Sequence, residues 1–332
     1  MKKISKNLIR SLRILFTCWI FFLFFCLTEK PSTSNKPIEL YANICDDDLR
    51  RIYLNAIEKA NESIYLIMYS LNDEKIIRAL NHKAKKGVKV TVLHDSKTSQ
   101  FGYRKLKSID LIPIEISGLS HQKILVLDGK EVWIGSANFT TESLRLHDNL
   151  VMKFNSIELA KSILSEFSAY YFYIGDQKCE LWHLPRDRKA GLNHLIDLIH
   201  QSKNSIRIAM YTWTHSKLTD AVIAAHNRGV AVEVILDNSQ ANGVGQRTTN
   251  KLIESGISVW VNRRQKLLHH KCLWIDENIL VQGSTNWTKA AFSKNKDCFL
   301  ILFDLTQEQK DKLQKMWFRT RTLAYRAKKS MT

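Results

Sequence analysis

Two segments of the sequence carry the same polar residues at the same spacing. Each reads His, any residue, Lys, four residues, Asp, six residues, Gly-Ser, any residue and Asn. With each residue type at roughly 5% of ordinary usage, a chance match of six fixed positions has odds on the order of 10⁻⁸. The repeated positions are His121, Lys123, Asp128, Ser136 and Asn138 in the first segment and His269, Lys271, Asp276, Ser284 and Asn286 in the second.

The types of these residues suit the chemistry of a phosphodiester. Because alternate residues of a strand face the same way, His121 and Lys123 point together, as do His269 and Lys271. Burying such pairs without a function is costly. Lysine ammonium groups and asparagine amides can neutralise phosphoryl oxygens, while two histidines can divide the nucleophile and general-acid roles. We therefore predict a reaction that needs no metal and no other cofactor.

The sequence offers no competing catalytic motif. It contains no phosphate-cradling Gly-x4-Gly-Lys-Ser/Thr loop, no His-Glu-x-x-His zinc motif and no Gly-x-Ser-x-Gly elbow. Its cysteines form no Cys-x-x-Cys pair, so zinc fingers and disulfide scaffolds are not indicated. Buried free thiols are expected at Cys45, Cys179, Cys272 and Cys298.

The elements around the two motifs also repeat, so the chain is predicted to be a duplication. Residues 63–95 align with residues 205–237 without a gap, which places Asp95 on Asp237. Strand-like and helix-like segments alternate in both halves, which predicts an α/β fold. We expect two homologous lobes, each a mostly parallel mixed sheet flanked by helices, packed about a pseudo-twofold axis that brings both polar sets into one cleft.

The second half has an insertion and ends in an amphipathic helix. Six extra residues separate Asp237 from His269, and the segment SQANGVGQRTTN either rims a cleft or forms an ordinary surface loop. In the C-terminal segment, Thr306 and Gln309 fit a capping box. One face of that helix is formed by Leu313, Met316, Trp317 and Thr320. This face favours a packing helix with a solvated basic side over a phosphate-binding tail.

The N-terminal segment is basic and then apolar. Residues 1–30 hold six Lys/Arg and one acid, and residues 14–27 are uncharged. A helix over that apolar run is about 21 Å long, short of the roughly 30 Å hydrocarbon core, which favours a signal peptide. No small-residue cleavage site follows, so a cleaved peptide and a retained anchor both stay open. We predict export across, or anchoring in, a bacterial-type inner membrane.

The predicted division of the chain follows from these patterns. Residues 1–30 are a signal peptide or N-terminal membrane anchor, 31–37 a linker, 38–175 the first lobe and 176–332 the second. The net charge is +18, and +13 remains when residues 1–30 are set aside. This excess favours a polyanionic partner, either nucleic acid or an anionic membrane surface.

With its doubled motif, the sequence resembles the phospholipase D superfamily over roughly residues 38–320. Its second motif looks most like those of mitochondrial cardiolipin hydrolases and bacterial exported nucleases. The resemblance implies a site at the lobe interface and a covalent phosphohistidine, with His121 as the nucleophile and His269 as the general acid and then base. Both half-sites lie in one chain, so no homodimer is required.

The resemblance also assigns supporting residues. An acidic residue bonded to each imidazole is implied, and Asp148 and Asp297 are the candidates. Asp128 and Asp276, grouped here with the catalytic motif, are implied to serve local structure more than proton transfer. Ser136, Asn138, Ser284 and Asn286 are assigned to phosphate binding or its support. Packing roles are expected for Phe139 and Trp287, and ordinary roles for His147 and His215.

Three functions remain open. The first is hydrolysis of a phospholipid headgroup ester, which fits a membrane-directed N-terminus and basic charge. The second is an exported or membrane-anchored endonuclease, because the same charge suits a nucleic-acid backbone. The third is an exported binding module without catalysis. Since aromatic residues at the spacing of an RNA-recognition motif are absent, the sequence favours the phospholipid.

Overall fold

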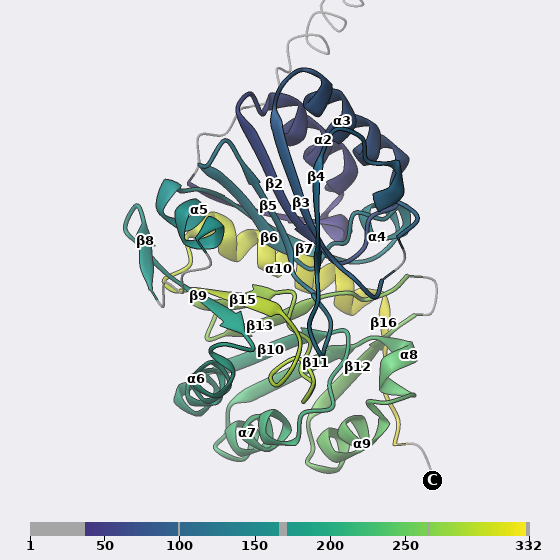
Figure 1. Cartoon of the computed structure of the whole chain (residues 1–332). Coiled ribbons are helices and arrows are strands. Elements are labelled where there is room, and N and C mark those ends of the chain that lie inside the picture. Colours follow the sequence, from purple (N-terminus) through teal and green to yellow (C-terminus); the bar gives the residue numbers. More distant parts are fainter. Residues whose placement is uncertain (1–36, 99, 166–170, 264–265, 330–332) are drawn as a thin grey trace, which may run out of the picture. The chain divides into compact units, whose positions relative to one another are not determined.

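The computed structural model describes residues 37–98, 100–165, 171–263 and 266–329, and the chain from Pro37 onward is one compact unit (Figure 1). The predicted signal peptide or anchor at 1–30 and residues 31–36 of the predicted linker lie outside the described residues. Among the helices that the structure describes, none is long and apolar enough to cross a membrane.

The first half of the chain (37–165) builds a sheet with seven strands. Their order is β1-β7-β6-β5-β2-β3-β4. The strands are β1 (Ile38–Ala42), β2 (Ser63–Met68), β3 (Lys89–Asp95), β4 (Asp110–Ile114), β5 (Lys123–Leu127), β6 (Glu131–Gly135) and β7 (Leu150–Asn155).

The second half (171–329) builds a sheet with nine strands in the order β16-β12-β11-β10-β13-β14-β15-β9-β8. They are β8 (Phe172–Ile174), β9 (Gln177–Leu184), β10 (Ser205–Met210), β11 (Ala231–Leu236), β12 (Ser258–Asn262), β13 (Lys271–Ile275), β14 (Ile279–Gly283), β15 (Asp297–Leu302) and β16 (Ala324–Arg326). Without β8 and β16, this order repeats that of the first sheet, with β9 in place of β1. Because β8 pairs with β9, the second sheet begins before the predicted boundary at 175.

The mixed α/β class is confirmed, but the expectation of mostly parallel strands was wrong. Parallel pairing is confined to β2-β3-β4 and β10-β11-β12. The strands on the other side of β2 and β10 pair antiparallel. The reason is local: each motif folds as a hairpin, β5-β6 or β13-β14, and two strands joined by a tight turn run antiparallel.

Helices pack against the faces of both sheets. They are α2 (Leu49–Lys59), α3 (Glu74–Lys85), α4 (Thr141–Arg145), α5 (Ile157–Leu164), α6 (Arg188–Gln201), α7 (Ser216–Asn227), α8 (Asn238–Ala241), α9 (Gln246–Glu254) and α10 (Gln307–Thr322), with short 3-10 turns η1 (Asn43–Cys45) and η2 (Tyr103–Lys105). One hydrophobic cluster joins α2 and α3 to the first sheet, and another joins α6, α7 and α9 to the second.

A third hydrophobic cluster joins the opposite faces of the two sheets, and α10 takes part in it. Leu313, Met316 and Trp317 of α10 are buried there, and Figure 1 shows this helix, in yellow, between the sheets. Each such side chain contributes about 1.5–3 kcal/mol by leaving water. The prediction of a packing helix is therefore confirmed, as is its capping box at Thr306 and Gln309.

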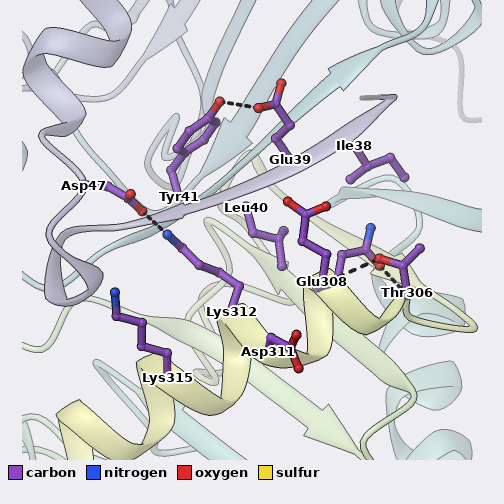
Figure 2. Close-up of a pocket in the computed structure, with 11 residues that line it drawn as sticks. Ile38, Glu39, Leu40, Tyr41, Asp47, Thr306, Glu308, Asp311, Lys312 and Lys315 are labelled. Atoms are coloured by element: carbon purple, nitrogen blue, oxygen red, sulfur yellow. Dashed lines mark hydrogen bonds and ion pairs between the residues drawn. The ribbon is translucent and has the colours of Figure 1, made fainter. Parts of the chain in front are cut away.

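The basic side of α10 is only partly solvated, contrary to expectation. A cavity of about 400 Å³ lies between β1 and α10, where Lys312 pairs with Asp47 at 2.6 Å. Figure 2 shows this ion pair. Two turns further along, Arg319 pairs with Asp46 at 2.5 Å. The acids that precede α2 thus neutralise part of the tail's charge, which ties the C-terminal helix to the first half of the chain.

Candidate active site

Backbone pairing brings the two His-Lys motifs together across the two halves. The backbone nitrogen of His121 donates to the backbone oxygen of Lys296 at 2.7 Å. The backbone nitrogen of His269 donates to the backbone oxygen of Asp148 at 2.8 Å. Each catalytic candidate is therefore held by a residue of the opposite half. The two motifs also interact electrostatically. The charge of Lys123 contributes to lowering the pKa of His269, and the charge of Lys271 contributes to lowering the pKa of His121.

Each imidazole is bonded to a side chain from the other half. His121 Nδ1 lies 2.9 Å from Asp297 Oδ1, and His269 Nδ1 lies 3.0 Å from Asn149 Oδ1. Asn149 and Asp297 occupy equivalent positions in the two halves. The backbone nitrogen of Ser136 donates to the carbonyl oxygen of the residue after Asn149, and that of Ser284 donates to the carbonyl oxygen of the residue after Asp297. One half-site thus has a carboxylate where the other has an amide.

The prediction that Asp148 orients a histidine was wrong. Its backbone oxygen holds the His269 nitrogen, but the ring of His269 is bonded by Asn149, one residue later. In a strand, a shift of one residue moves the side chain to the opposite face. The other candidate, Asp297, does bond an imidazole, although the ring belongs to His121 and not to His269 of its own half.

These contacts fix the same tautomer in both rings. A carboxylate only accepts hydrogen bonds, so His121 Nδ1 must donate to Asp297. Asn149 Nδ2 donates to the Ser143 carbonyl oxygen at 2.8 Å, which turns Oδ1 toward the other ring. His269 Nδ1 therefore also carries the proton, and Nε2 of each neutral ring keeps a lone pair for chemistry.

The motif serines stand behind the imidazoles. Ser284 Oγ donates to Asp297 Oδ1 at 2.6 Å, and Ser136 Oγ donates to Asn149 Oδ1 at 2.9 Å. Both serines are fully buried, so the structure gives them the supporting role and not a phosphate contact. Asn138 and Asn286 are only partly buried, and their predicted contact with phosphate stays a prediction.

The two lysines are buried beside the histidines. Lys123 Nζ donates to the His121 carbonyl oxygen, and Lys271 Nζ donates to that of His269 at 2.9 Å. Burial, opposed by Asp297, lowers the pKa of Lys123 to about 7. Burial and then Lys123 hold the pKa of Lys271 well below its usual range. An anion bound between the two ammonium groups would restore their charge, which is the electrostatic requirement of a phosphate site.

The histidines differ in their charge environment. Burial and then Lys123 lower the pKa of His121, while Asp297 opposes that shift. Burial and then Lys271 hold the pKa of His269 well below its usual range, together with Lys123, His121 and His147. Asn149 is uncharged and supplies no such opposition. Of the two rings, His121 is thus the one whose cation has a built-in counter-ion.

The motif aspartates do not reach the chemistry. Asp128 accepts from the backbone nitrogens of residues 61–63 at 2.8–3.1 Å, beyond the far end of β5 from His121. Asp276 does the same for residues 203–205 at 2.7–2.9 Å. Grouping them with the catalytic residues was wrong, because each closes the turn after its strand and ties it to the start of β2 or β10.

Sequence reasoning missed two matched pairs of supporting residues. Asp95 accepts from the Ser120 nitrogen at 2.6 Å, and Asp237 accepts from the Leu268 nitrogen at 3.1 Å, so each holds the residue before a catalytic histidine. Tyr69 and Tyr211 each lie 5.1 Å from the neighbouring histidine ring. The members of each pair fall on the same position when the duplicated segments are aligned. This identity of residue type in both copies was the sequence signal that could have found them.

The remaining side-chain expectations concern packing. Phe139 and Trp287 are buried, and Cys45, Cys179, Cys272 and Cys298 are buried free thiols, all as predicted. The His147 ring lies 6.2 Å from that of His269, and His215 precedes α7 with its ring against Phe292. Across the described residues, no group of three or more His, Cys, Asp or Glu side chains could hold a metal ion; that the reaction needs none stays a prediction.

Comparison with known proteins places this geometry in a family. The family described as "Cardiolipin synthase, PLD-like domain" matches residues 53–171 and 195–317, more than half of the chain and once in each half. Phosphatidylserine synthase of Haemophilus influenzae has the same fold, with a TM-score of 0.71 over 88% of each chain at 15% identity.

Curated relatives match a shorter stretch. Mitochondrial cardiolipin hydrolase of Chlamydomonas reinhardtii is 33% identical over 146 residues, which cover 42% of this chain and 63% of that protein. Phospholipase D of Rickettsia conorii is 33% identical over 118 residues, which cover 34% of this chain and 59% of that protein. The chain spans about six tenths of the length of these relatives. With the family match in both halves, the chain belongs to the PLD-like domain family of the phospholipase D superfamily.

Proposed function

We propose that this protein is a phosphodiesterase of the phospholipase D type that hydrolyses a phospholipid headgroup ester. The observation that carries the proposal is the crossed pair of imidazoles. Each keeps Nε2 available because its Nδ1 is bonded to the opposite half, at 2.9 Å for His121 and 3.0 Å for His269. Two buried lysines beside them supply positive charge for a phosphoryl group.

In the proposed first step, His121 Nε2 attacks phosphorus and the bond from phosphorus to the leaving alcohol oxygen breaks. The negative charge of the bound phosphodiester favours protonation of His269 at Nε2, and the protonated ring donates this proton to that oxygen, so the alcohol leaves neutral. The resulting phosphohistidine carries a cationic ring. Asp297, bonded to Nδ1 of that ring, stabilises the cation, which favours His121 over His269 as the nucleophile.

In the second step, the now neutral His269 accepts a proton from water. The water oxygen attacks phosphorus, the bond from phosphorus to His121 Nε2 breaks, and a phosphomonoester is released. His269 ends protonated and His121 neutral, as at the start. Lys123 and Lys271 balance the phosphoryl oxygens throughout, and no step uses a metal ion.

A phospholipid is favoured as substrate by the names of the relatives and by charge. The matching proteins are named cardiolipin hydrolase and phospholipase D, and the excess of basic residues suits an anionic membrane surface. The same charge suits a nucleic-acid backbone, so an endonuclease with this mechanism is the second candidate. Export or membrane anchoring through residues 1–30 is part of the proposal.

The test uses the full chain in detergent with EDTA present throughout. The substrates are bis(p-nitrophenyl) phosphate, phosphatidylglycerol and phosphatidylcholine in mixed micelles, and single-stranded DNA. We expect turnover of the chromogenic diester and a phospholipid. His121→Ala should abolish turnover and the covalent phosphoprotein. His269→Ala should still give one burst of nitrophenolate per chain, because that leaving group needs no acid.

Each contrary result has a distinct meaning. Loss of turnover with EDTA contradicts the metal-free mechanism, and cleavage of DNA with intact lipid establishes the endonuclease. A phosphoprotein that survives His121→Ala and is absent from His269→Ala reverses the two roles. Binding of phospholipid without turnover of any diester establishes the non-catalytic binding module.

A further inference from the structure

A cavity of about 510 Å³, lined mainly by polar residues, opens in the second half of the chain, where Leu267 on its wall lies two residues before His269. Its volume lies within the range of about 300–1,000 Å³ usual for small-molecule sites. Its lining includes Asp237, Asn238, Ser239, Asn242, Asn262 and Lys266. Three of these, Asn238, Ser239 and Asn242, lie in α8 or directly after it, at the start of the inserted segment.

The cavity shares a wall with the candidate active site. Asp237, which lines it, accepts from the Leu268 nitrogen at 3.1 Å, and Leu268 directly precedes His269. Gln240 of α8 donates to the Tyr211 hydroxyl at 3.5 Å, and the Tyr211 ring contacts that of His269. A group bound in the cavity would therefore lie on the side of the proposed general acid.

The equivalent place in the first half carries a lysine. Lys97, two residues after Asp95, donates from Nζ to the carbonyl oxygens of Ile116, Ser117 and Gly118 at 2.6–3.1 Å. Its counterpart two residues after Asp237 is Ser239, whose hydroxyl donates to Asp237 at 2.6 Å. A short side chain that bonds its own turn leaves open the space that a lysine fills in the other half.

The walls of the cavity suit hydroxyl groups. Asn242 Nδ2 donates to the Asn238 carbonyl oxygen at 3.0 Å, which leaves the amide oxygen to accept from a ligand. Lys266 adds an exposed cationic donor. No aromatic ring is among the residues that line this cavity, so it lacks the cage that binds choline-type cations and the platform on which a nucleobase stacks.

We propose that this cavity is the subsite for the leaving alcohol and that it takes a small hydroxylated group such as the glycerol headgroup of phosphatidylglycerol. The inference rests on the proposed function, in which His269 protonates the leaving oxygen. The alcohol must then lie over His269, and the rest of that alcohol points to the cavity that borders it. Specificity for the headgroup is thus set by the half of the chain that carries the insertion.

The test compares Asn242→Leu with Asn193→Leu, a control exposed on α6. Phosphatidylglycerol, phosphatidylcholine and bis(p-nitrophenyl) phosphate are the substrates. We expect Asn242→Leu to lower kcat/KM for phosphatidylglycerol about tenfold, the loss of one hydrogen bond of about 1.4 kcal/mol to a hydroxyl. The nitrophenyl ester has no hydroxyl on its leaving group, so its turnover should stay within about twofold of wild type, as should all three substrates with the control.

The failures of the two proposals are separable. If wild type turns over phosphatidylglycerol but Asn242→Leu lowers all three substrates equally, or none, the subsite is overturned while the function stands. If wild type prefers phosphatidylcholine, the predicted class of headgroup is wrong. If wild type turns over none of the diesters, the proposed function fails, and the subsite with it. If, in a parallel assay with single-stranded DNA, Asn242→Leu slows cleavage of that substrate alone, the cavity binds a nucleoside and the proposal is also wrong.

Discussion

The two halves of the candidate site are built from the same motif but differ in the partner of the imidazole. His121 has a carboxylate, Asp297, and His269 has an amide, Asn149, at nearly the same distance. Hydrogen-bond geometry and tautomer are therefore alike, and the charge differs. The two half-sites therefore share the positions of their reacting atoms. The difference between Asp297 and Asn149 gives the rings different chemistry, because the His121 ring can hold a positive charge while the His269 ring readily gives up its proton.

Making the half-sites alike should have the largest effect. Asp297→Asn keeps the shape that Asn149 already shows to be compatible with the fold, but it removes the counter-ion of the phosphohistidine. We expect kcat for bis(p-nitrophenyl) phosphate to fall about 10²–10³-fold, an effect of about 3–4 kcal/mol. Steady-state kinetics and thermal melts measure it. Unchanged kcat in a folded variant would mean that the carboxylate does not stabilise the intermediate.

The reverse change, Asn149→Asp, should move the pH profile. A carboxylate on Nδ1 favours the charged ring, so the pKa of His269 should rise. The general acid must be protonated, and activity is lost as pH rises through its pKa. Raising that pKa therefore extends activity to higher pH, visible in kcat/KM for phosphatidylglycerol, whose alkoxide is a poor leaving group. An alkaline limb that stays in place would show that His269 is not the acid.

The serines behind the two rings offer a smaller contrast. Ser284 donates to a carboxylate and Ser136 to an amide, and hydrogen bonds to charged groups are the stronger ones. We expect Ser284→Ala to lower kcat about tenfold and Ser136→Ala about threefold. Ser293→Ala, at a hydroxyl that donates to the Lys289 carbonyl oxygen in the turn between β14 and β15, is the control. Equal losses from the two serines would argue against a difference in charge between the half-sites.

Asp148→Asn should leave turnover unchanged, since Asn149 bonds the ring. Burial raises the pKa of Asp148 to about 6, above its unfolded value, so the folded protein binds this proton more tightly than the unfolded chain does. The protonated Asp148 carboxyl therefore adds to the free energy of unfolding below about pH 4, and this contribution is lost as pH rises through about 6. Removing the carboxyl should raise the free energy of unfolding at neutral pH by about 2 kcal/mol and not at acid pH.

Denaturant unfolding at two pH values, with turnover measured in parallel, checks that prediction. Asp297→Asn serves as the contrasting variant, because it should lose activity. If Asp148→Asn loses activity as strongly as Asp297→Asn does, the carboxyl has a catalytic role that the geometry does not show.

Much of the fold could be predicted from local signals. The capping box of Thr306 and Gln309, the motif hairpins and the apolar face of α10 all depend on neighbours within a few residues in the chain. The share of parallel strands was overestimated because alternation of helices and strands holds only for the segments before each motif. Which strands lie beside β1 and β9 depends on pairings across more than a hundred residues, and such contacts have no local signature.

The candidate site shows the same division. The sequence by itself determined the doubled His-Lys set, its likeness to a phosphodiester site and the duplication, because spacing and residue type are properties of the chain. Only the tertiary structure decided which side chain reaches which ring. Asp148 and Asp297 look equivalent in the contexts HDNL and KDCF, yet the hydrogen bonds of Ser136 and Ser284 to the residues after them make Asn149 the structural counterpart of Asp297. A register shift of one residue turns a side chain to the other face, and the partner of each ring comes from the opposite half, so only the packed molecule brings them together.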